Sequence, residues 1–255
     1  MKCEIYIADH RKVQIDLEDP IPIGIPFKDR SPLRCFGAPP LSFDPLISGD
    51  FTGAIEAGAP VNFYNIKWNP HGNGTHTESV RHISNLPVFI GEIPGKQMFF
   101  ARLITVRPEE NDKGDLVISS LQMKEILSGS TDNIEALIVR TLPNVPAKMN
   151  TDYTDTNPPY FDPKALDFVR ESGIHHLLTD LPSVDREQDG GQLAAHKAFW
   201  NYPSNPRTTA TITELIYVPD TIPDGLYMLY LQILQIQLDA CPTSPVIYAI
   251  TQPEI

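Results

Sequence analysis

The sequence predicts an α/β protein in which two or three helices pack on a mixed, partly antiparallel sheet. Between residues 134 and 181, an apolar run, a helix with clear end signals and a second apolar run follow one another. This strand–helix–strand order is typical of α/β cores. Residues 1–100 read instead as strands and loops, and further strand-like runs close the chain. Together these three observations give the predicted fold class.

The first expected elements lie before residue 130. Residues 86–93 form a short apolar run that predicts a buried strand. Ser119 and Gln122 stand three residues apart, a capping-box pattern in which polar side chains satisfy exposed N–H groups at a helix start. We therefore expect a helix over residues 121–127 that stops at Gly129.

The clearest helix is expected between two buried strands. Residues 134–140 predict the first strand by their β-branched content. Asp162 is the expected N-cap, Pro163 the first helical residue and Gly173 the end of the helix. Its apolar face is expected to consist of Ala165, Leu166, Phe168 and Val169. Residues 175–181 predict the second strand.

The last third of the chain adds a short helix and two strands. Residues 193–200 predict a short helix that carries His196. Residues 226–238 are expected to form a long strand, and residues 246–250 a closing strand. These runs complete the mixed sheet.

Composition favours a single domain over residues 1–255. Hydrophobic residues make up 41% of the chain, and no linker-like run or internal repeat divides it. The 25 prolines are about twice as frequent as usual. They cluster at 20–26, 39–45 and 143–163, and predict ordered loops and arms, including an extended region over about residues 18–50.

Charge and apolar patterning exclude several classes of partner. A net charge of −12 argues against nucleic acid, which binds basic faces. Residues 1–10 lack the apolar core of a signal peptide, and no apolar run reaches about 18 residues, so no membrane partner is expected. Cys3, Cys35 and Cys241 are too few and too scattered for a disulfide framework. We expect a cytoplasmic protein with reduced thiols.

The candidate site is concentrated in one histidine-rich stretch around a Gly-Asn-Gly segment. His76, Glu78 and His82 are separated by even numbers of residues, which places side chains on one face of an extended chain. His71 lies five residues before His76, on the opposite face, unless a bulge in the Gly-Asn-Gly segment inserts one extra residue. Two imidazoles and a carboxylate on one face suit a divalent metal site or an acid–base site.

This stretch resembles the signature of the cyclase family of metal-dependent hydrolases, His-x-Gly-Thr-His-x-Asp-x-Pro-x-His. The positions that match in register are Gly74, Thr75, His76 and His82. Glu78 stands where the family has aspartate, Val80 where it has proline, and Gly72 where it has the first histidine. The nearest candidate for that histidine is His71, which either joins the site through a bulge or points away from it.

The rest of the chain is similar to the same family in the same order. Residues 15–17 look like its opening strand, and residues 161–185 like its central helix, strand and Pro-Ser-x-Asp turn. His196 matches a downstream metal-binding histidine, and Glu214 matches a downstream glutamate. Residues 224–250 look like its last two strands. The resemblance implies the family's swivelling β/β/α fold.

The resemblance also implies a hydrolase that uses one or two Zn²⁺ or Mn²⁺ ions. The implied ligands are His76, Glu78, His196 and Glu214, with His71 if the bulge forms. The metal held by His76 and Glu78 would acidify a water molecule, which would attack the carbonyl of the substrate. His82 would pass a proton to the leaving nitrogen. The implied small-molecule substrates are cyclic amides or N-formyl amides of aromatic amines, as in the arylformamidase step of tryptophan catabolism. The aromatic candidates to line the pocket are Phe63, Tyr64 and Trp68.

Two alternatives to this function stay open. The missing histidine at position 72 and the replaced aspartate at position 78 are compatible with a metal-poor relative that binds a small molecule without catalysis. A hydrolase of lactones or cyclic amides is equally compatible with the fold. In either case the family implies a homodimer or homotetramer, with an arm from residues 20–45 crossing between subunits.

Other polar residues of the chain have structural interpretations. Asp185 follows a Pro-Ser pair and is expected to hold a turn. His175 and His176 lie beside a predicted strand and are expected to be structural, whereas His10 is expected to be exposed.

Overall fold

The core of the protein is a nine-stranded mixed sheet. The computed structural model describes residues 1–7, 12–93, 95–128 and 133–251, so His10 and the expected helix stop at Gly129 lie outside the described residues. The strands of the sheet lie in the order β17–β8–β15–β14–β12–β9–β16–β18–β3. In chain order their bounds are β3 (Ile21–Pro22), β8 (His76–Glu78), β9 (Met98–Val106), β12 (Ala136–Thr141), β14 (His176–Thr179), β15 (Thr211–Glu214), β16 (Gly225–Tyr230), β17 (Ala240–Pro242) and β18 (Val246–Ala249).

The sheet has a parallel centre and antiparallel flanks. β12 pairs in parallel with β9 and with β14, and β14 pairs in parallel with β15. The strands β8, β17, β16, β18 and β3 join these in antiparallel pairs. Parallel neighbours require a crossover connection, which a helix usually supplies. The predicted mixed, partly antiparallel sheet is confirmed.

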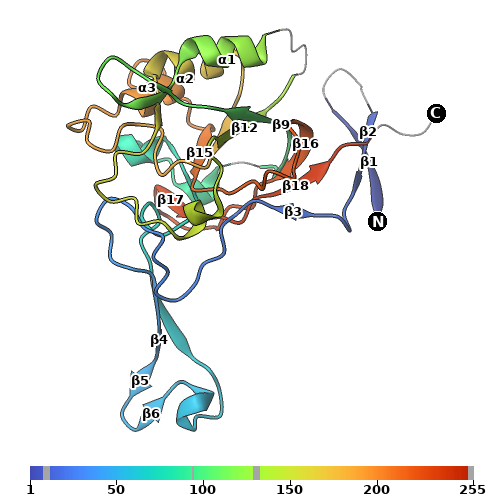
Figure 1. Ribbon diagram of the computed structural model, residues 1–255. Helices are drawn as coiled ribbons and strands as arrows, with labels where there is room; N and C mark the ends of the chain where they lie inside the picture. Colours follow the sequence, from blue (N-terminus) through green and yellow to red (C-terminus); the bar gives the residue numbers. More distant parts are fainter. Residues whose placement is uncertain (8–11, 94, 129–132, 252–255) are drawn as a thin grey trace.

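Three helices supply the crossovers and lie together on one side of the sheet (Figure 1). They are α1 (Ser120–Leu127), α2 (Pro163–Glu171) and α3 (Ala194–Trp200). The capping box of Ser119 and Gln122 begins α1, and the Asp162 side chain accepts the N–H of Lys164 at the start of α2. Gly173 follows α2 with a left-handed φ of 81°. The start signals read from the sequence are therefore confirmed for both helices, and the stop at Gly173 is confirmed for α2.

Alternate side chains of the parallel strands fill two separate cores. In β12, Leu137 and Val139 pack with the helices and with Phe161, whereas Ala136 and Ile138 contribute to the core on the other side. This is the period-two alternation of a strand that is buried on both faces. It explains why residues 136–139 are apolar throughout.

Two hairpins extend from the sheet (Figure 1). Near the N-terminus, β1 pairs with β2, and residues 15–17 fall at the end of β2. The second hairpin, residues 42–67, is called the arm below; it projects away from the helices, and β4 pairs with β7 along its length. The bounds of the hairpin elements are β1 (Lys2–Tyr6), β2 (Lys12–Asp16), β4 (Ser42–Pro45), β5 (Ile47–Ser48), β6 (Phe51–Thr52) and β7 (Tyr64–Lys67). The proline-rich region 18–50 therefore contributes β3 and the first half of the arm.

A three-stranded sheet also lies outside the main one. It consists of β10 (Glu109–Glu110), β11 (Leu116–Ile118) and β13 (Tyr160–Phe161). β11 and β13 immediately precede α1 and α2, so this sheet ties the starts of two helices together.

Two strand predictions differ from the structure. Residues 86–93 form no strand; Ile90–Glu92 make a 3₁₀ turn, in which the Ile90 side chain is buried. A short apolar run without alternation does not distinguish a strand from a buried turn. The strand expected over residues 226–238 is too long, because β16 ends at Tyr230 and Leu234 is 52% exposed.

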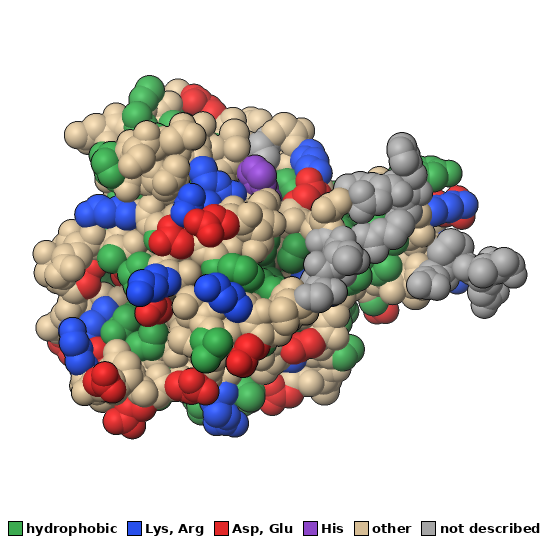
Figure 2. All heavy atoms as spheres, turned by 90° about the horizontal axis from the view of Figure 1, so that it is seen from above, with side chains coloured by type: hydrophobic (Ala, Val, Ile, Leu, Met, Phe, Trp, Pro, Cys, Tyr) green, Lys and Arg blue, Asp and Glu red, His purple; other side chains and the backbone are tan. Residues whose placement is uncertain are grey.

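Charges of both signs are intermixed on the surface above the helices. Figure 2 shows Lys and Arg side chains lying among Asp and Glu on this face. The absence of a nucleic-acid partner and the single domain over residues 1–255 stay predictions.

Candidate metal centre

β8 places His76 and Glu78 on the same face of the sheet. Both side chains are fully buried. Thr77 lies between them and points to the opposite face, where its hydroxyl lies 2.8 Å from that of Thr213 and 3.0 Å from that of Thr243. The alternation of a short strand thus fixes two candidate ligands.

Glu214 lies directly across from His76, because it ends the neighbouring strand β15. Its Oε2 is 3.4 Å from His76 Nε2, and its Oε1 is 3.9 Å from His196 Nε2. Oε1 also accepts the backbone N–H of Val184 at 2.9 Å. Glu214 is therefore a buried member of the cluster and not a solvated residue at the edge of a strand.

His196 reaches Glu78 from helix α3. Its Nε2 lies 3.0 Å from Glu78 Oε1, and its Nδ1 lies 2.5 Å from Asp185 Oδ2. Asp185 also accepts the backbone N–H groups of Ala195 at 2.7 Å and of His196 at 3.2 Å. Asp185, for which the sequence predicted only a turn, thus holds the start of α3 and orients the His196 ring.

The loop before β8 brings His71 into the centre. The N–H of Gly72 bonds to Asn69 Oδ1 at 2.9 Å, which tightens the loop. His71 Nδ1 consequently lies 3.2 Å from Glu78 Oε2. A Cβ on Gly72 would lie 2.3 Å from the Cβ of Ala38. No side chain fits at position 72, and the histidine one residue earlier occupies the centre.

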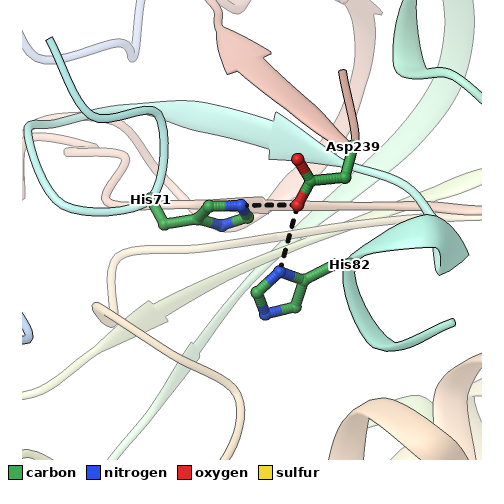
Figure 3. A group of neighbouring side chains, drawn as sticks. All are labelled: His71, His82 and Asp239. Carbon is green, nitrogen blue, oxygen red and sulfur yellow. Dashed lines mark hydrogen bonds and ion pairs between the residues drawn. The ribbon is translucent and has the colours of Figure 1, made fainter.

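His82 enters through a 3₁₀ turn, Val80–Ile83, and not by continuing the extended strand. Figure 3 shows it beside Asp239 and His71. Asp239 Oδ2 lies 3.3 Å from His82 Nδ1 and 2.8 Å from His71 Nε2. The sequence did not reveal Asp239, because it lies 157 residues from His82 in the chain and belongs to no local motif.

The carboxylates of the centre shift the pKa values of its histidines. Burial would lower the pKa of His71, but hydrogen bonds to Asp239 and Glu78 outweigh this effect and raise it to about 10. Burial is likewise outweighed at His196, where Glu78 and Asp185 hold the pKa well above its usual value. Glu78 is fully buried, yet the charges of His82 and His196 keep its pKa well below normal. A metal ion entering the centre would have to displace these histidine protons.

Within the centre, two buried donor atoms, His76 Nε2 and Glu78 Oε2, lack a well-aligned hydrogen bond among the described residues. They lie 3.4 Å from Glu214 Oε2 and 3.2 Å from His71 Nδ1, respectively. Because buried polar atoms are almost always hydrogen-bonded, such a pair needs an explanation, and a bound ion is one. The groups whose ligand atoms lie within 4.8 Å of one another are His71, His76 and Glu78; Glu78, His82 and His196; and His71, His82 and Asp239. Imidazole and carboxylate donors suit Zn²⁺ and Mn²⁺. The residues present therefore fit one or two divalent ions.

A pocket of about 380 Å³ opens onto the centre. Its lining includes His71, His82, His196 and Glu214, together with Phe36 and Leu193. Phe36 has a left-handed φ of 56°, which is unusual for a bulky residue, and it is 47% exposed. The aromatic residues expected to line the pocket lie elsewhere: Phe63 and Tyr64 belong to the arm and are exposed, and Trp68 is not in the lining. Phe36 is the aromatic residue of the pocket.

The pocket is rich in carboxylates. Asp185, Glu187 and Asp189 contribute to its lining along with one arginine, Arg186. The Arg186 guanidinium donates to Asp115 Oδ2 at 2.9 Å, so its charge is already paired.

The structure brings every candidate ligand and His82 into one cluster and leaves two other histidines outside it. His176 is buried, and its Nδ1 lies 2.9 Å from the hydroxyl of Thr211. Burial lowers the pKa of His176 to about 3, so its ring is neutral, as suits a structural residue. His175 is exposed.

The mixed sheet with helical crossovers and the buried histidine–carboxylate centre define an α/β protein with a candidate metal site. The sequence matches the family model described as putative cyclase over residues 15–186, so the chain belongs to the putative cyclase family. A search of curated proteins found no match.

Solved structures share the fold at low sequence identity. A predicted metal-dependent hydrolase from Bacillus stearothermophilus is 15% identical, with a TM-score of 0.63 over 90% of this chain and 98% of the other. An isatin hydrolase bound to the product analogue thioisatinate is 14% identical, with a TM-score of 0.67 over 91% and 93%. Isatin hydrolase A from Labrenzia aggregata, bound to benzyl benzoate, is 17% identical, with a TM-score of 0.58 over 97% and 93%. These likenesses confirm the predicted fold.

None of the helices among the described residues combines the length and the apolar composition that spanning a bilayer requires. The cytoplasmic location stays a prediction.

Proposed function

We propose that this protein is a metal-dependent hydrolase of amide bonds. The observation that carries the proposal is the pair of fully buried donor atoms, His76 Nε2 and Glu78 Oε2, which face histidine and carboxylate groups without a well-aligned hydrogen bond. Three further donors, His71, His196 and Glu214, face the same centre, and a pocket large enough for a small molecule opens onto it.

These residues would hold one or two Zn²⁺ or Mn²⁺ ions. Glu78 is the shared residue, because one of its oxygens faces His71 and the other faces His196. A divalent cation bound here supplies Lewis-acid chemistry, which activates water and polarises a carbonyl. The buried carboxylates fix the donor atoms before the metal arrives, so little reorganisation is needed.

His82 is the proposed proton carrier. It lines the pocket, its side chain is 27% exposed, and Asp239 holds its Nδ1. Its ring can therefore accept a proton from the attacking water and deliver it to the leaving nitrogen. Among the histidines of the centre, His82 has the most exposed side chain, at 27% against 23% for His71, so it is well placed to exchange protons with solvent.

An N-formyl amide of an aromatic amine is the first candidate substrate. Phe36 and Leu193 give the pocket apolar surface that suits an aryl group. The formyl carbonyl is small enough to approach the buried donors.

A neutral cyclic amide is the second candidate, and the charge of the pocket favours it. Glu187 and Asp189 line the pocket, and Arg186 is paired with Asp115. A substrate with a free carboxylate would be repelled by these charges. One solved structure with the same fold is an isatin hydrolase, and isatin itself is a neutral cyclic amide, which agrees with this candidate.

The test is hydrolysis by protein loaded with zinc or manganese, assayed on aryl formamides, cyclic amides and lactones. Metal content is measured first, on protein purified without chelator or metal-affinity resin. We expect His76→Ala to lose both bound metal and hydrolysis, and His175→Ala, a matched change of an exposed histidine, to keep both. Full hydrolysis by His76→Ala would overturn the mechanism. Failure to bind either metal would instead support a non-catalytic binding protein.

We further propose that the protein forms a homodimer or homotetramer through the arm. The arm carries exposed apolar side chains, namely Ile47, Ile55, Val61, Phe63, Tyr64 and Ile66. Clustered apolar exposure of this kind marks interaction surfaces. The proposed contact lies mainly beyond the region 20–45 that the sequence suggested. Light scattering should give a multiple of 28.5 kDa, and Ile66→Lys should lower it.

A further inference from the structure

Glu78 lies between two histidines, each of which is held on its far side by an aspartate. On one side, His196 presents Nε2 to Glu78 at 3.0 Å and Nδ1 to Asp185 at 2.5 Å. On the other side, His71 presents Nδ1 to Glu78 at 3.2 Å and Nε2 to Asp239 at 2.8 Å. The two rings therefore turn opposite nitrogens toward the centre.

The backbone explains why the His71 ring presents Nδ1 to Glu78, whereas the His196 ring presents Nε2. Position 72 is filled by the contact between Gly72 and Ala38, so the histidine comes from position 71. It reaches the centre from a different point of the loop and presents the nitrogen nearer its own backbone. A neutral imidazole has one protonated nitrogen and one with a free lone pair, and the hydrogen bond of the first decides which nitrogen can bind a metal.

Asp239 is firmly anchored where it meets His71. Its carbonyl accepts the N–H of Ser79 at 2.9 Å, and the next residue, Ala240, pairs with Glu78 across β17 and β8. An anchored carboxylate accepts hydrogen bonds and cannot donate one, so it keeps the proton on His71 Nε2. The same carboxylate oxygen also contacts His82 Nδ1 (Figure 3).

We propose that Asp239 is a positioning residue that makes His71 a metal ligand through Nδ1, and so compensates for the missing histidine at position 72. The inference rests on the proposed metal-dependent function. Asp239 does for His71 what Asp185 does for His196, with the two ring nitrogens exchanged.

The test measures zinc binding without any substrate. Hydrogen-bond partners of ligating histidines typically contribute about 10- to 100-fold in metal affinity, so Asp239→Ala should weaken zinc binding by that factor in competition with a chromophoric chelator. Asp239→Glu, which keeps the carboxylate, should recover part of the loss. Asp112→Asn, a change of an exposed aspartate outside the site, should leave the affinity unchanged. Circular dichroism should show that all variants are folded.

Nitrogen NMR of histidine-labelled, zinc-loaded protein gives the second readout. The His71 signals, assigned by their loss in His71→Gln, should show a metal-shifted Nδ1 and a protonated Nε2. A metal-shifted Nε2 at His71 would overturn the proposal, as would unchanged zinc affinity in Asp239→Ala. If the wild-type protein binds neither zinc nor manganese, the proposed function and this inference both fail. If the wild-type protein binds zinc and Asp239→Ala binds it with the same affinity, this inference fails and the proposed function stands.

Discussion

The two sides of Glu78 use the same contacts in different surroundings. His196 and Asp185 are 2% and 7% exposed, and they belong to helix α3 and the segment that starts it. The side chains of His71 and Asp239 are 23% and 31% exposed, and they belong to loops that line the pocket or border β17. We call these pairs the inner side and the outer side of the centre.

The difference in exposure indicates that the two sides of the centre have different roles. Regular structure fixes the inner side, since a helix start and two strands hold its donors. The outer side meets the pocket, where His82 also lies, so proton exchange and substrate contact take place there. Rigid ligands on one side and accessible ones on the other suit a site that must hold an ion and still admit substrate.

Removing the residue that both sides share should have the largest effect. In Glu78→Gln, the inner and outer histidines lose their common anionic partner. We expect metal affinity to fall by more than the about 100-fold that loss of a supporting partner costs, and hydrolysis to fall with it. Elemental analysis and kinetics measure the change, and Glu92→Gln, an exposed glutamate, is the control. Retained metal in Glu78→Gln would contradict the shared role.

Stability should separate the two sides in the chelated protein. Asp185→Ala removes the acceptor for three N–H groups around α3, and should lower the free energy of unfolding by about 1–3 kcal/mol. Asp239→Ala affects partly exposed ion pairs and should cost less than about 1 kcal/mol. Urea unfolding in the presence of chelator measures both. Equal losses would mean that the two sides do not differ in rigidity.

The pH dependence of stability should reverse when metal binds. The folded-state pKa of His71 is raised to about 10, so in chelated protein its pairing contributes fully below about pH 6.5 and is lost as the pH rises through about 10. Metal binding requires deprotonated histidines, so it is favoured as the pH rises. Between pH 6 and 9, we expect Tm to fall in chelated protein, and the increase in Tm caused by zinc or manganese to grow. Parallel Tm profiles would argue against His71 as a ligand.

A pocket residue outside both sides should have the smallest effect. Phe36→Ala should raise KM for aryl substrates and leave kcat nearly unchanged, because an aromatic contact contributes about 0.5–1.5 kcal/mol, or roughly 2- to 12-fold. Phe63→Ala, on the arm, is the matched control and should leave KM unchanged. A large fall in kcat for Phe36→Ala would indicate a role nearer the reacting atoms.

The sequence predicted the inner side better than the outer side. The short helical run over residues 193–200 and the even spacing of His76 and Glu78 are local signals, so they located α3 and β8, and with them His196, His76 and Glu78. Asp239 carries no local pattern, since its role arises only when β17 pairs with β8. Whether His71 joins the centre also depended on a distant contact, that of Gly72 with Ala38.

The arm and the pocket also depend on features that have no local sequence pattern. Exposed apolar side chains on a hairpin cannot be distinguished by sequence from a buried strand. The aromatic lining was expected from Phe63 and Tyr64 because they lie near the histidine-rich stretch in the sequence, but they belong to the arm and are exposed. Phe36 was overlooked because a left-handed φ at a phenylalanine has no sequence signature.

The contact between Gly72 and Ala38 couples two sequence positions. A histidine introduced at 72 would collide with the Cβ of Ala38, and removal of His71 by itself would take a donor from the centre. No single substitution therefore converts this arrangement into one with its ligand at 72. Engineering that conversion requires a concerted change at positions 38, 71 and 72, which makes the two arrangements separate solutions to the same coordination problem.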